Sequence, residues 1–334
     1  MGFEPERARK GLEVAYFRDV VGIDVSKENL DLYVLSAQQR RTVPNTAAGY
    51  RDLVSWLKSL GVRMAVMEAS GGYERDVAKA LRQAGFDVRI VDPKRVRHFA
   101  KAAGRLAKND RIDAEMIAEF GAVFAAAQRC EIPLDAKREH LAGLVATRQA
   151  LMDHQTSLQN QISACPKGPA RQALAAALKP IPASIKQLDR LIAQAIAAHP
   201  QFAALAARLN TVPGVGPVTI AALISWLPEL GRLDRRALAA LVGVAPFDDD
   251  SGKRTGQRYI KGGRGKLRNI VYMAVMGAAT QHNPVLKAYY DSLLKRGKLK
   301  KVALIACLRK LLTILNTMVA KQQDWNPASM AIAA

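Results

Sequence analysis

Four carboxylates occupy positions from which they could hold one divalent cation: Asp24, Glu68, Asp110 and Asp113. The first two each end a short apolar run that is typical of a buried strand. The other two stand three residues apart at the start of an apolar-periodic segment, and residues with this spacing share one face of a helix. Hard cations take oxygen ligands, usually a few carboxylates plus substrate phosphates. The set therefore predicts a Mg²⁺ site, with Mn²⁺ as an alternative ion, for phosphoryl transfer on nucleic acid.

Each of these residues also has a simpler interpretation when taken alone. An aspartate after a strand is most often a turn residue, and Asp110 by itself fits a helix N-cap. Asp113 by itself fits a first-turn partner of the helix dipole. The joint order of strand-Asp, strand-Glu and helix Asp-x-x-Asp within one region favours the metal site over these separate roles.

The elements that must position these carboxylates alternate between strands and helices from about residue 19 to residue 127. Strands are predicted at 20–23, 30–35, 64–67 and 87–91, and helices after Thr46, Tyr73 and Asp92. A short polar turn joins the first two strands, which predicts an antiparallel pair. The whole pattern is typical of an α/β layer architecture.

The charge of the chain indicates a polyanionic partner. Its 334 residues carry a formal net charge of +21, and the sequence pI is about 10.1. Such an excess favours nucleic acid, with a membrane surface or a ribosomal role as the alternatives. The composition, with 24% charged and 49% hydrophobic residues, is that of an ordinary globular chain. This length predicts two domains or a little more.

The three cysteines are widely spaced, at Cys130, Cys165 and Cys307. They form no C-x-x-C pair, so a zinc ribbon, a disulfide framework and a redox motif are all unsupported. The N-terminus has no long apolar stretch, and the later apolar stretches are short or interrupted by charges. We therefore expect a protein of a reducing cytoplasm, without a signal peptide, a membrane span or a membrane partner.

The middle of the chain, from about residue 136 to residue 209, is rich in Ala, Leu, Gln and Lys with long helical periodicity. Prolines interrupt it at 166–169 and 180–182. The pattern predicts a helical hairpin or coiled-coil spacer. Its packing stripe would consist of Leu188, Leu191, Ile192 and Ile196.

A glycine turn opens the last third of the chain. Gly214 and Gly216 precede an apolar helix, and such a turn offers backbone N–H groups and a positive helix end to a phosphate. Helix-hairpin-helix elements hold DNA backbones in this way without reading sequence. A plain turn between two helices explains the same residues equally well.

A basic run of one sign follows, with no acidic residue inside it: Lys253, Arg254, Arg258, Lys261, Arg264, Lys266 and Arg268. Glycines are interleaved with these side chains. Solvated faces usually mix charges of both signs, so the run predicts a surface that approaches phosphates closely.

Ser251 stands between an acidic turn and this basic run. A serine there is most often a turn or cap residue. The five histidines are scattered and none forms a local signature with it, so a Ser-His-Asp hydrolase triad is unsupported. A serine that attacks a phosphodiester could instead be activated by a metal held elsewhere in the chain.

Taken together, these motifs resemble the DEDD transposases of the IS110 insertion-sequence family, which includes Piv-type DNA invertases and bridge-RNA-guided recombinases. In the first half the matching segments are Gly22–Lys27, Met67–Tyr73 and Lys108–Ala114. In the second half they are Val212–Gly216, Leu241–Pro246, Ser251–Lys253 and the pair Leu267-Arg268. The likeness runs from about residue 20 to residue 318, and the four carboxylates with the Ser-Gly element are its most specific part.

The resemblance implies a domain order as well as a chemistry. An N-terminal extension at 1–18 would precede an RNase H-like, RuvC-like domain at 19–130. A helical coiled-coil spacer at 131–209 and a mainly α C-terminal transposase domain at 210–325, with a helix-hairpin-helix-like element, would follow. Asp24, Glu68, Asp110 and Asp113 would coordinate Mg²⁺, and Ser251 would attack the scissile phosphate to give a covalent phosphoserine–DNA intermediate.

The partners that the resemblance implies are donor and target DNA, a structured bridge RNA encoded by the element, and further copies of the chain in a dimer or tetramer. The location that it implies is the bacterial cytoplasm, in association with the nucleoid. Two other classes of protein remain open. A hydrolytic nuclease of the junction-resolvase type would need only the four carboxylates and not Ser251. A non-enzymatic nucleic-acid-binding protein would account for the charge and leave the carboxylates as coincidence.

Overall fold

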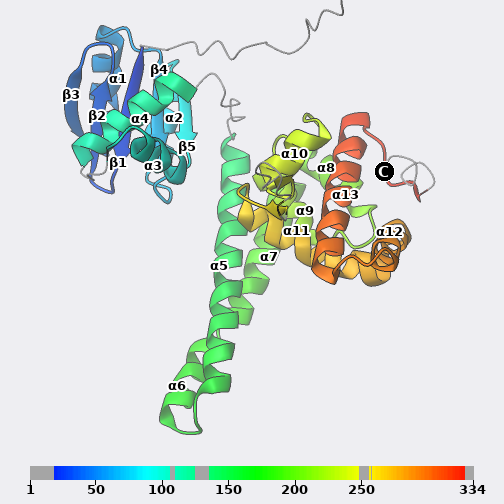
Figure 1. Ribbon diagram of the computed structural model, residues 1–334. Coiled ribbons are helices and arrows are strands. Elements are labelled where there is room, and N and C mark those ends of the chain that lie inside the picture. The colour runs from blue at the N-terminus through cyan, green and yellow to red at the C-terminus, as the bar shows by residue number, and fades with distance from the viewer. Residues whose placement is uncertain (1–18, 106–109, 125–134, 248–255, 257, 328–334) are drawn as a thin grey trace, which may run out of the picture. The chain divides into compact units, whose positions relative to one another are not determined.

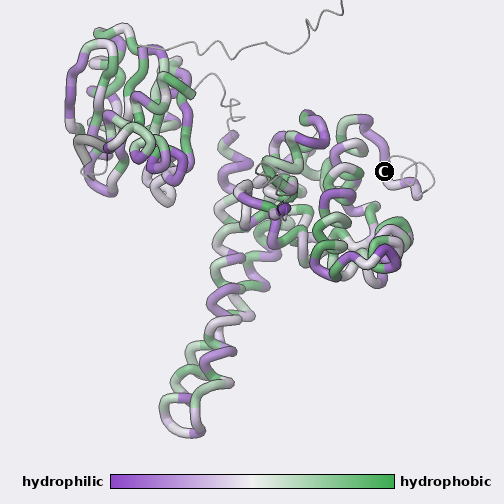
Figure 2. The backbone as a smooth tube through the Cα atoms, viewed as in Figure 1, coloured by the Kyte–Doolittle hydropathy of each residue, from purple (hydrophilic) through white to green (hydrophobic). Residues whose placement is uncertain are grey.

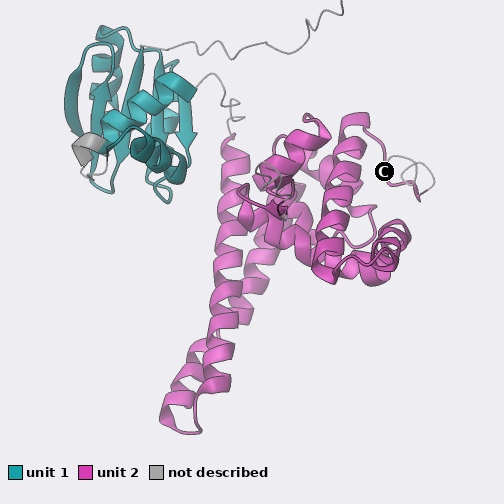
Figure 3. Cartoon of the chain, in the orientation of Figure 1, with its two compact units in different colours: residues 1–131 teal, residues 132–334 magenta. Residues whose placement is uncertain are grey.

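The computed structural model describes residues 19–105, 110–124, 135–247, 256 and 258–327, with the side chains of 110–112 left out. The chain divides into two compact units, residues 1–131 and residues 132–334 (Figure 3). We describe each unit by itself.

Unit 1 is a mixed α/β layer. Within its described residues the strands are β1 (Val20–Val25), β2 (Asn29–Val34), β3 (Gln39–Pro44), β4 (Met64–Glu68) and β5 (Asp87–Val91). They form one sheet in the order β3-β2-β1-β4-β5. β1, β2 and β3 pair antiparallel, whereas β1, β4 and β5 pair parallel. This mixed sheet is compatible with the RNase H-like fold that we expected.

The helices of unit 1 cover both faces of this sheet. They are α1 (Ala47–Ser59), α2 (Glu74–Gln83), α3 (Pro93–Ala102) and α4 (Asp110–Phe124). Successive residues of a strand point to opposite faces. Accordingly, Ile23 packs in a core with Leu53 of α1 and Leu81 of α2, whereas Val20 packs in a second core with Phe120 of α4.

Three helices of unit 1 begin directly after the residues that the sequence predicts, Thr46, Tyr73 and Asp92, and two of these residues cap their helix with the side chain. The side chain of Thr46 accepts a hydrogen bond from the Gly49 backbone N–H and caps α1. The side chain of Asp92 accepts one from the Lys94 N–H and caps α3, with Pro93 in the first turn. These are the residue types that satisfy free backbone donors at helix starts.

The edge strand β3 was not predicted. Its sequence, QRRTVP, buries Val43 alone, and its other residues are half-buried or exposed. In Figure 2 the outer strand is largely hydrophilic, in contrast to the central strands. Charged residues on an edge strand discourage pairing with another chain, and they also remove the apolar alternation by which a strand is recognised.

Unit 2 is almost entirely helical in its described residues. Its first helices are α5 (Ala136–Ala164), α6 (Pro169–Leu178), α7 (Ile181–Ala197) and α8 (Pro200–Asn210). The later helices are α9 (Pro217–Trp226), α10 (Arg235–Val242), α11 (Gly265–Gly277), a π-helical turn η1 (Ala278–His282), α12 (Pro284–Lys295) and α13 (Lys300–Lys321). Two short strands, β6 (Pro246–Phe247) and β7 (Tyr259–Ile260), pair antiparallel between α10 and α11.

The predicted spacer belongs to unit 2 and is not a separate body. α5 and α7 pack side by side, and α6 lies at the far end of this hairpin (Figure 1). Near its start, α5 places Leu141 and Val145 in the core of unit 2. Of the predicted stripe on α7, Ile192 is buried and Ile196 half-buried, but Leu191 points to solvent.

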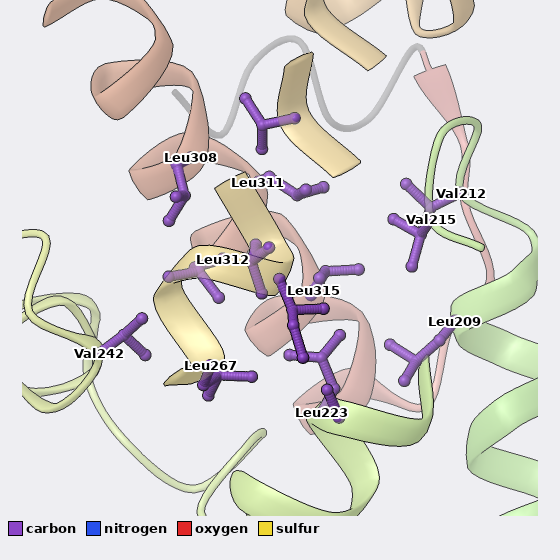
Figure 4. Close-up of a cluster of buried hydrophobic side chains, with 14 of the residues drawn as sticks. Leu209, Val212, Val215, Leu223, Val242, Leu267, Leu308, Leu311, Leu312 and Leu315 are labelled. Carbon is purple, nitrogen blue, oxygen red and sulfur yellow. The ribbon is translucent and has the colours of Figure 1, made fainter. Parts of the chain in front are cut away.

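The core of unit 2 is organised around α13. Leu308, Leu311, Leu312 and Leu315 are buried at a spacing that marks one helix face, and Leu223 and Leu267 pack in the same cluster (Figure 4). By length and apolar composition, α13 is the one described helix that could cross a membrane, and half of its most apolar window is buried. The apolarity of α13 therefore fits a core helix.

Candidate active site and nucleic-acid surface

Asp24 and Glu68 stand at neighbouring positions on adjacent parallel strands. The register of β1 and β4 runs from Val20 opposite Met64 to Ile23 opposite Met67, and the next residue on each strand is a carboxylate. Adjacent strands lie about 4.8 Å apart. By alternation, both carboxylates belong to the sheet face that α4 covers, and both are half-buried.

α4 reaches this same edge because glycines let it lie directly on the sheet. A Cβ on Gly22 would overlap the Ala114 carbonyl oxygen, and a Cβ on Gly121 would overlap the Val66 side chain. The start of α4 therefore lies near the carboxyl end of β1, and the later turns of α4 lie near the amino end of β1. Asp113, one residue before Ala114, is brought to the end of the sheet where Asp24 and Glu68 lie.

Glu68 and Asp113 line one cavity of about 350 Å³ between β4, α3 and α4. Four basic side chains of α3 line the same cavity: Lys94, Arg97, His98 and Lys101. Carboxylates beside cations suit a hard cation bound together with a phosphate. Asp24 does not line this cavity, and among the described side chains no three from His, Cys, Asp and Glu are grouped closely enough to hold an ion. The Asp110 side chain lies outside the described residues.

The loop after Glu68 is held by a residue that the sequence did not single out. Glu74, buried at the start of α2, accepts hydrogen bonds from the Ser70 N–H and hydroxyl and from the Gly72 N–H. Burial opposes ionisation of this carboxyl, but these hydrogen bonds and that of its own N–H outweigh it, so the pKa of Glu74 is lowered. The role of Glu74 could have been found from its spacing, because a glutamate three or four residues after small polar residues can accept hydrogen bonds from them.

Asn45 ties this loop to the turn that follows Asp24. Its side-chain amide donates to the Ser26 carbonyl at 2.9 Å and to the Tyr73 carbonyl at 3.3 Å. Its side-chain oxygen accepts from the Tyr50 hydroxyl at 2.6 Å. The turns behind both strand-end carboxylates are therefore fixed to each other, which favours a constant separation of the two.

In unit 2 a backbone crossing holds the chain on either side of Ser251. Gly243 ends α10 with φ +81°, and a Cβ there would overlap the Gly262 carbonyl oxygen. A Cβ on Gly263 would overlap the Gly243 backbone. The ribbon of β6 and β7 rises from this crossing, and the segment that joins its strands contains Ser251. Ser251, Lys253 and Arg254 themselves lie outside the described residues.

The basic run divides into two groups. Arg258, Lys261 and Lys266 are exposed. Arg264 instead donates to both carboxylate oxygens of Glu229, at 2.6 and 2.7 Å, and Arg268 donates to the Gly243 and Gly262 carbonyls at 2.9 and 2.8 Å. Arg264 and Arg268 therefore stabilise the fold through these hydrogen bonds. Contact with nucleic acid stays a prediction for all seven residues of the basic run.

The glycine turn before α9 also has an internal role. Gly214 has φ +90°, and a Cβ on it would overlap the side chain of Ala278. The buried Asn283 donates to the Pro213 carbonyl at 3.2 Å. A Cβ on Gly216 would meet open space. Packing thus accounts for Gly214, and phosphate binding by Gly214 and Gly216 stays a prediction.

Two family models match the chain. The DEDD model of IS110, described as a transposase, covers residues 21–167, and the model of the transposase IS116/IS110/IS902 family covers residues 206–291. The chain belongs to the IS110 family of transposases. It is accordingly a DNA recombinase enzyme. The first match contains the four carboxylates, and the second contains Ser251 and the basic run.

Relatives of this IS110-family transposase carry two kinds of name. The pilin gene-inverting proteins of Moraxella lacunata and Moraxella bovis are each 26% identical over 323 residues, which cover 92% of this chain and 97% of each relative. The Streptomyces clavuligerus protein called "Insertion element IS116 uncharacterized 44.8 kDa protein" is 32% identical over 126 residues, 36% of this chain and 30% of that protein. The Moraxella similarity therefore spans both units.

Proposed function

We propose that this transposase cuts and rejoins DNA through a covalent phosphoserine intermediate on Ser251. The observation that supports it most is the gathering of Glu68 and Asp113 on one cavity, at the sheet edge where Asp24 is the strand neighbour of Glu68. Carboxylates on the ends of rigid elements are the kind of oxygen donors that phosphoryl transfer needs.

Asp24, Glu68, Asp110 and Asp113 would hold Mg²⁺, or Mn²⁺ in its place. When bound, the ion would stabilise charge on the phosphoryl oxygens and favour ionisation of the attacking hydroxyl. The basic side chains of α3 would bind the DNA phosphate at the mouth of the same cavity. Asn45 and Glu74 would keep the two carboxylate-bearing turns in place.

The serine step balances without water. The Ser251 Oγ forms a bond to phosphorus as the bond from phosphorus to a deoxyribose oxygen breaks. The hydroxyl loses its proton and the leaving oxygen takes one up. Because one phosphodiester replaces another, the strand can be rejoined by the reverse attack of a new hydroxyl. Strand exchange requires that this phosphodiester linkage be kept, whereas hydrolysis loses it.

The four carboxylates belong to unit 1 and Ser251 belongs to unit 2. We propose that the two come from different copies of the chain in a dimer or tetramer. The substrates are donor and target DNA, and a structured bridge RNA encoded by the element guides them. The net charge of +21 supports a large polyanionic assembly of this kind.

The test compares Ser251→Ala with Ser163→Ala, a matched change at an exposed serine of α5. Ser251→Ala should fold and bind DNA but give neither strand exchange nor a covalent protein–DNA adduct, whereas Ser163→Ala should retain both. The adduct is trapped on nicked DNA and mapped by mass spectrometry. Normal recombination by Ser251→Ala would overturn the covalent mechanism and leave a hydrolytic nuclease in which the carboxylates activate water.

A further inference from the structure

Two aromatic side chains stand exposed on the ribbon that carries Ser251. Phe247 of β6 and Tyr259 of β7 are register partners, and they are 46% and 53% exposed. Residues directly opposite each other on antiparallel strands point to the same face, with Cβ atoms about 5 Å apart. Among the described residues, the exposed large apolar side chains include one other aromatic, Tyr73 of unit 1. Exposed apolar side chains that lie together point to a binding surface more than scattered single ones do.

The charge around this pair selects the kind of partner. Arg258 precedes Tyr259 and Lys261 follows β7, and both are exposed. The sequence has no Asp or Glu from Ser251 to Tyr290. Aromatic faces interleaved with cations bind single-stranded nucleic acid, because bases stack on the rings while phosphates meet the charges. An apolar protein surface would match the rings but not the positive charge around them.

The ribbon is also held rigidly at its base. The crossing of Gly243 with Gly262 and Gly263 leaves no space for a side chain, and Arg268 hydrogen-bonds the Gly243 and Gly262 carbonyls across it. Rings on such a support lose little freedom when a ligand binds, which strengthens binding. Phe247 is four residues from Ser251 in the chain.

We propose that Phe247 and Tyr259 form a stacking platform for an unpaired DNA base, with Arg258 and Lys261 on the adjoining phosphates. A strand that changes partners must leave its old duplex, so unstacked bases arise beside the cut. The position of this base next to the attacked phosphate rests on the proposed role of Ser251. The binding of the base itself does not.

The experiment separates stacking from charge. The full chain carrying Ser251→Ala is titrated with a fluorescent single-stranded oligonucleotide and with an abasic oligonucleotide of equal length. We expect the normal strand to bind roughly 10- to 100-fold more tightly, as for one or two stacked bases. Phe247→Leu with Tyr259→Leu should reduce this preference to nearly one. Arg258→Gln with Lys261→Gln should weaken both oligonucleotides by the same factor and keep the preference.

Two controls define the outcome. Met273→Ala removes an exposed apolar side chain of α11 that is 64% exposed, and Tyr259→Phe keeps the ring, so both should retain the preference. Circular dichroism melting checks the fold of each variant. A full preference in the double leucine variant would overturn the proposal. The proposal would also be overturned if the double leucine variant changed its mass in sedimentation while it kept its preference for the normal strand over the abasic one. The rings would then contact another copy of the chain. If the native protein formed no covalent adduct with DNA, only the proposed role of Ser251 would be contradicted, and the stacking platform would not.

Discussion

The two units support their predicted chemical groups in different ways. Unit 1 places carboxylates on the ends of two neighbouring strands and at the start of a helix, so sheet pairing fixes their spacing. Unit 2 carries its serine on a segment between two short strands, and glycines clamp the base of that segment. The first arrangement suits groups that must keep a constant separation, and the second suits a group presented to a large substrate.

Removing one carboxylate should have the largest effect and would test whether the sheet edge acts as one unit. We expect Glu68→Gln or Asp113→Asn to lower strand cleavage by about 10³-fold, since the loss of one charged oxygen donor withdraws several kcal/mol of stabilisation. Asp52→Asn, on the exposed side of α1, is the control. Cleavage is measured on nicked DNA at saturating Mg²⁺. Activity within threefold of the native protein in both variants would refute a joint site.

The glycine under α4 can be tested against a glycine with free space. Gly22→Ala should lower the free energy of unfolding by about 1–3 kcal/mol, because the new methyl group meets the backbone of α4. Gly143→Ala, in α5, meets nothing within 4 Å and should raise stability by about 0.5–1 kcal/mol. Urea unfolding gives both values. Equal effects would mean that α4 does not lie on Gly22.

The division of the basic run predicts two unlike outcomes. Arg264→Gln should lower the free energy of unfolding by about 1–3 kcal/mol, because it leaves the largely buried Glu229 carboxylate without its partner. Lys266→Gln should leave stability unchanged and make the salt dependence of duplex binding shallower by about 0.9 in slope. Thermal melts and binding titrations from 50 to about 200 mM salt separate the two. A stability loss in Lys266→Gln together with a shallower salt dependence in Arg264→Gln would show that the two roles are exchanged.

The smallest predicted effect is a pH dependence in unit 1. The pKa of Glu74 is lowered in the folded chain, so its stabilisation is present above the unfolded pKa of 4.5 and is lost as pH falls through the folded pKa. Glu74→Gln should therefore lower Tm at pH 7, and the difference from the native protein should shrink below pH 4.5. A difference that grows on acidification would contradict the hydrogen bonds to Ser70 and Gly72.

The sequence predicted the central strands of unit 1 because they carry long apolar runs that end at turns. It missed β3, whose residues are mostly polar, since an edge strand needs only one buried side chain. The mixed sheet followed by helices was predicted at the level of fold class. The roles of Asn45 and Glu74 could not be predicted, because their partners are backbone groups of other turns.

The candidate site likewise combines features that the sequence predicts with features that depend on tertiary contacts. Glu68 and Asp113 line one cavity, but Asp24 does not, and metal binding by the four carboxylates stays a prediction. The sequence predicts one uniform surface for the basic run, because charge alone does not distinguish an exposed lysine from an arginine that binds a carboxylate. Only the structure shows that Arg264 and Arg268 are engaged within the fold.

The crossing of Gly243 and Gly263 bears on how the transposase could be engineered. Because the two ends of the intervening segment are held together by backbone contact, the chain between them is already closed into a loop. Doubling the length of a flexible loop costs only about 0.6 kcal/mol of closure entropy. The helical core of unit 2 should therefore tolerate a change in the number of residues between Gly243 and Gly263, whatever that change does to the proposed roles of Phe247, Ser251 and Tyr259.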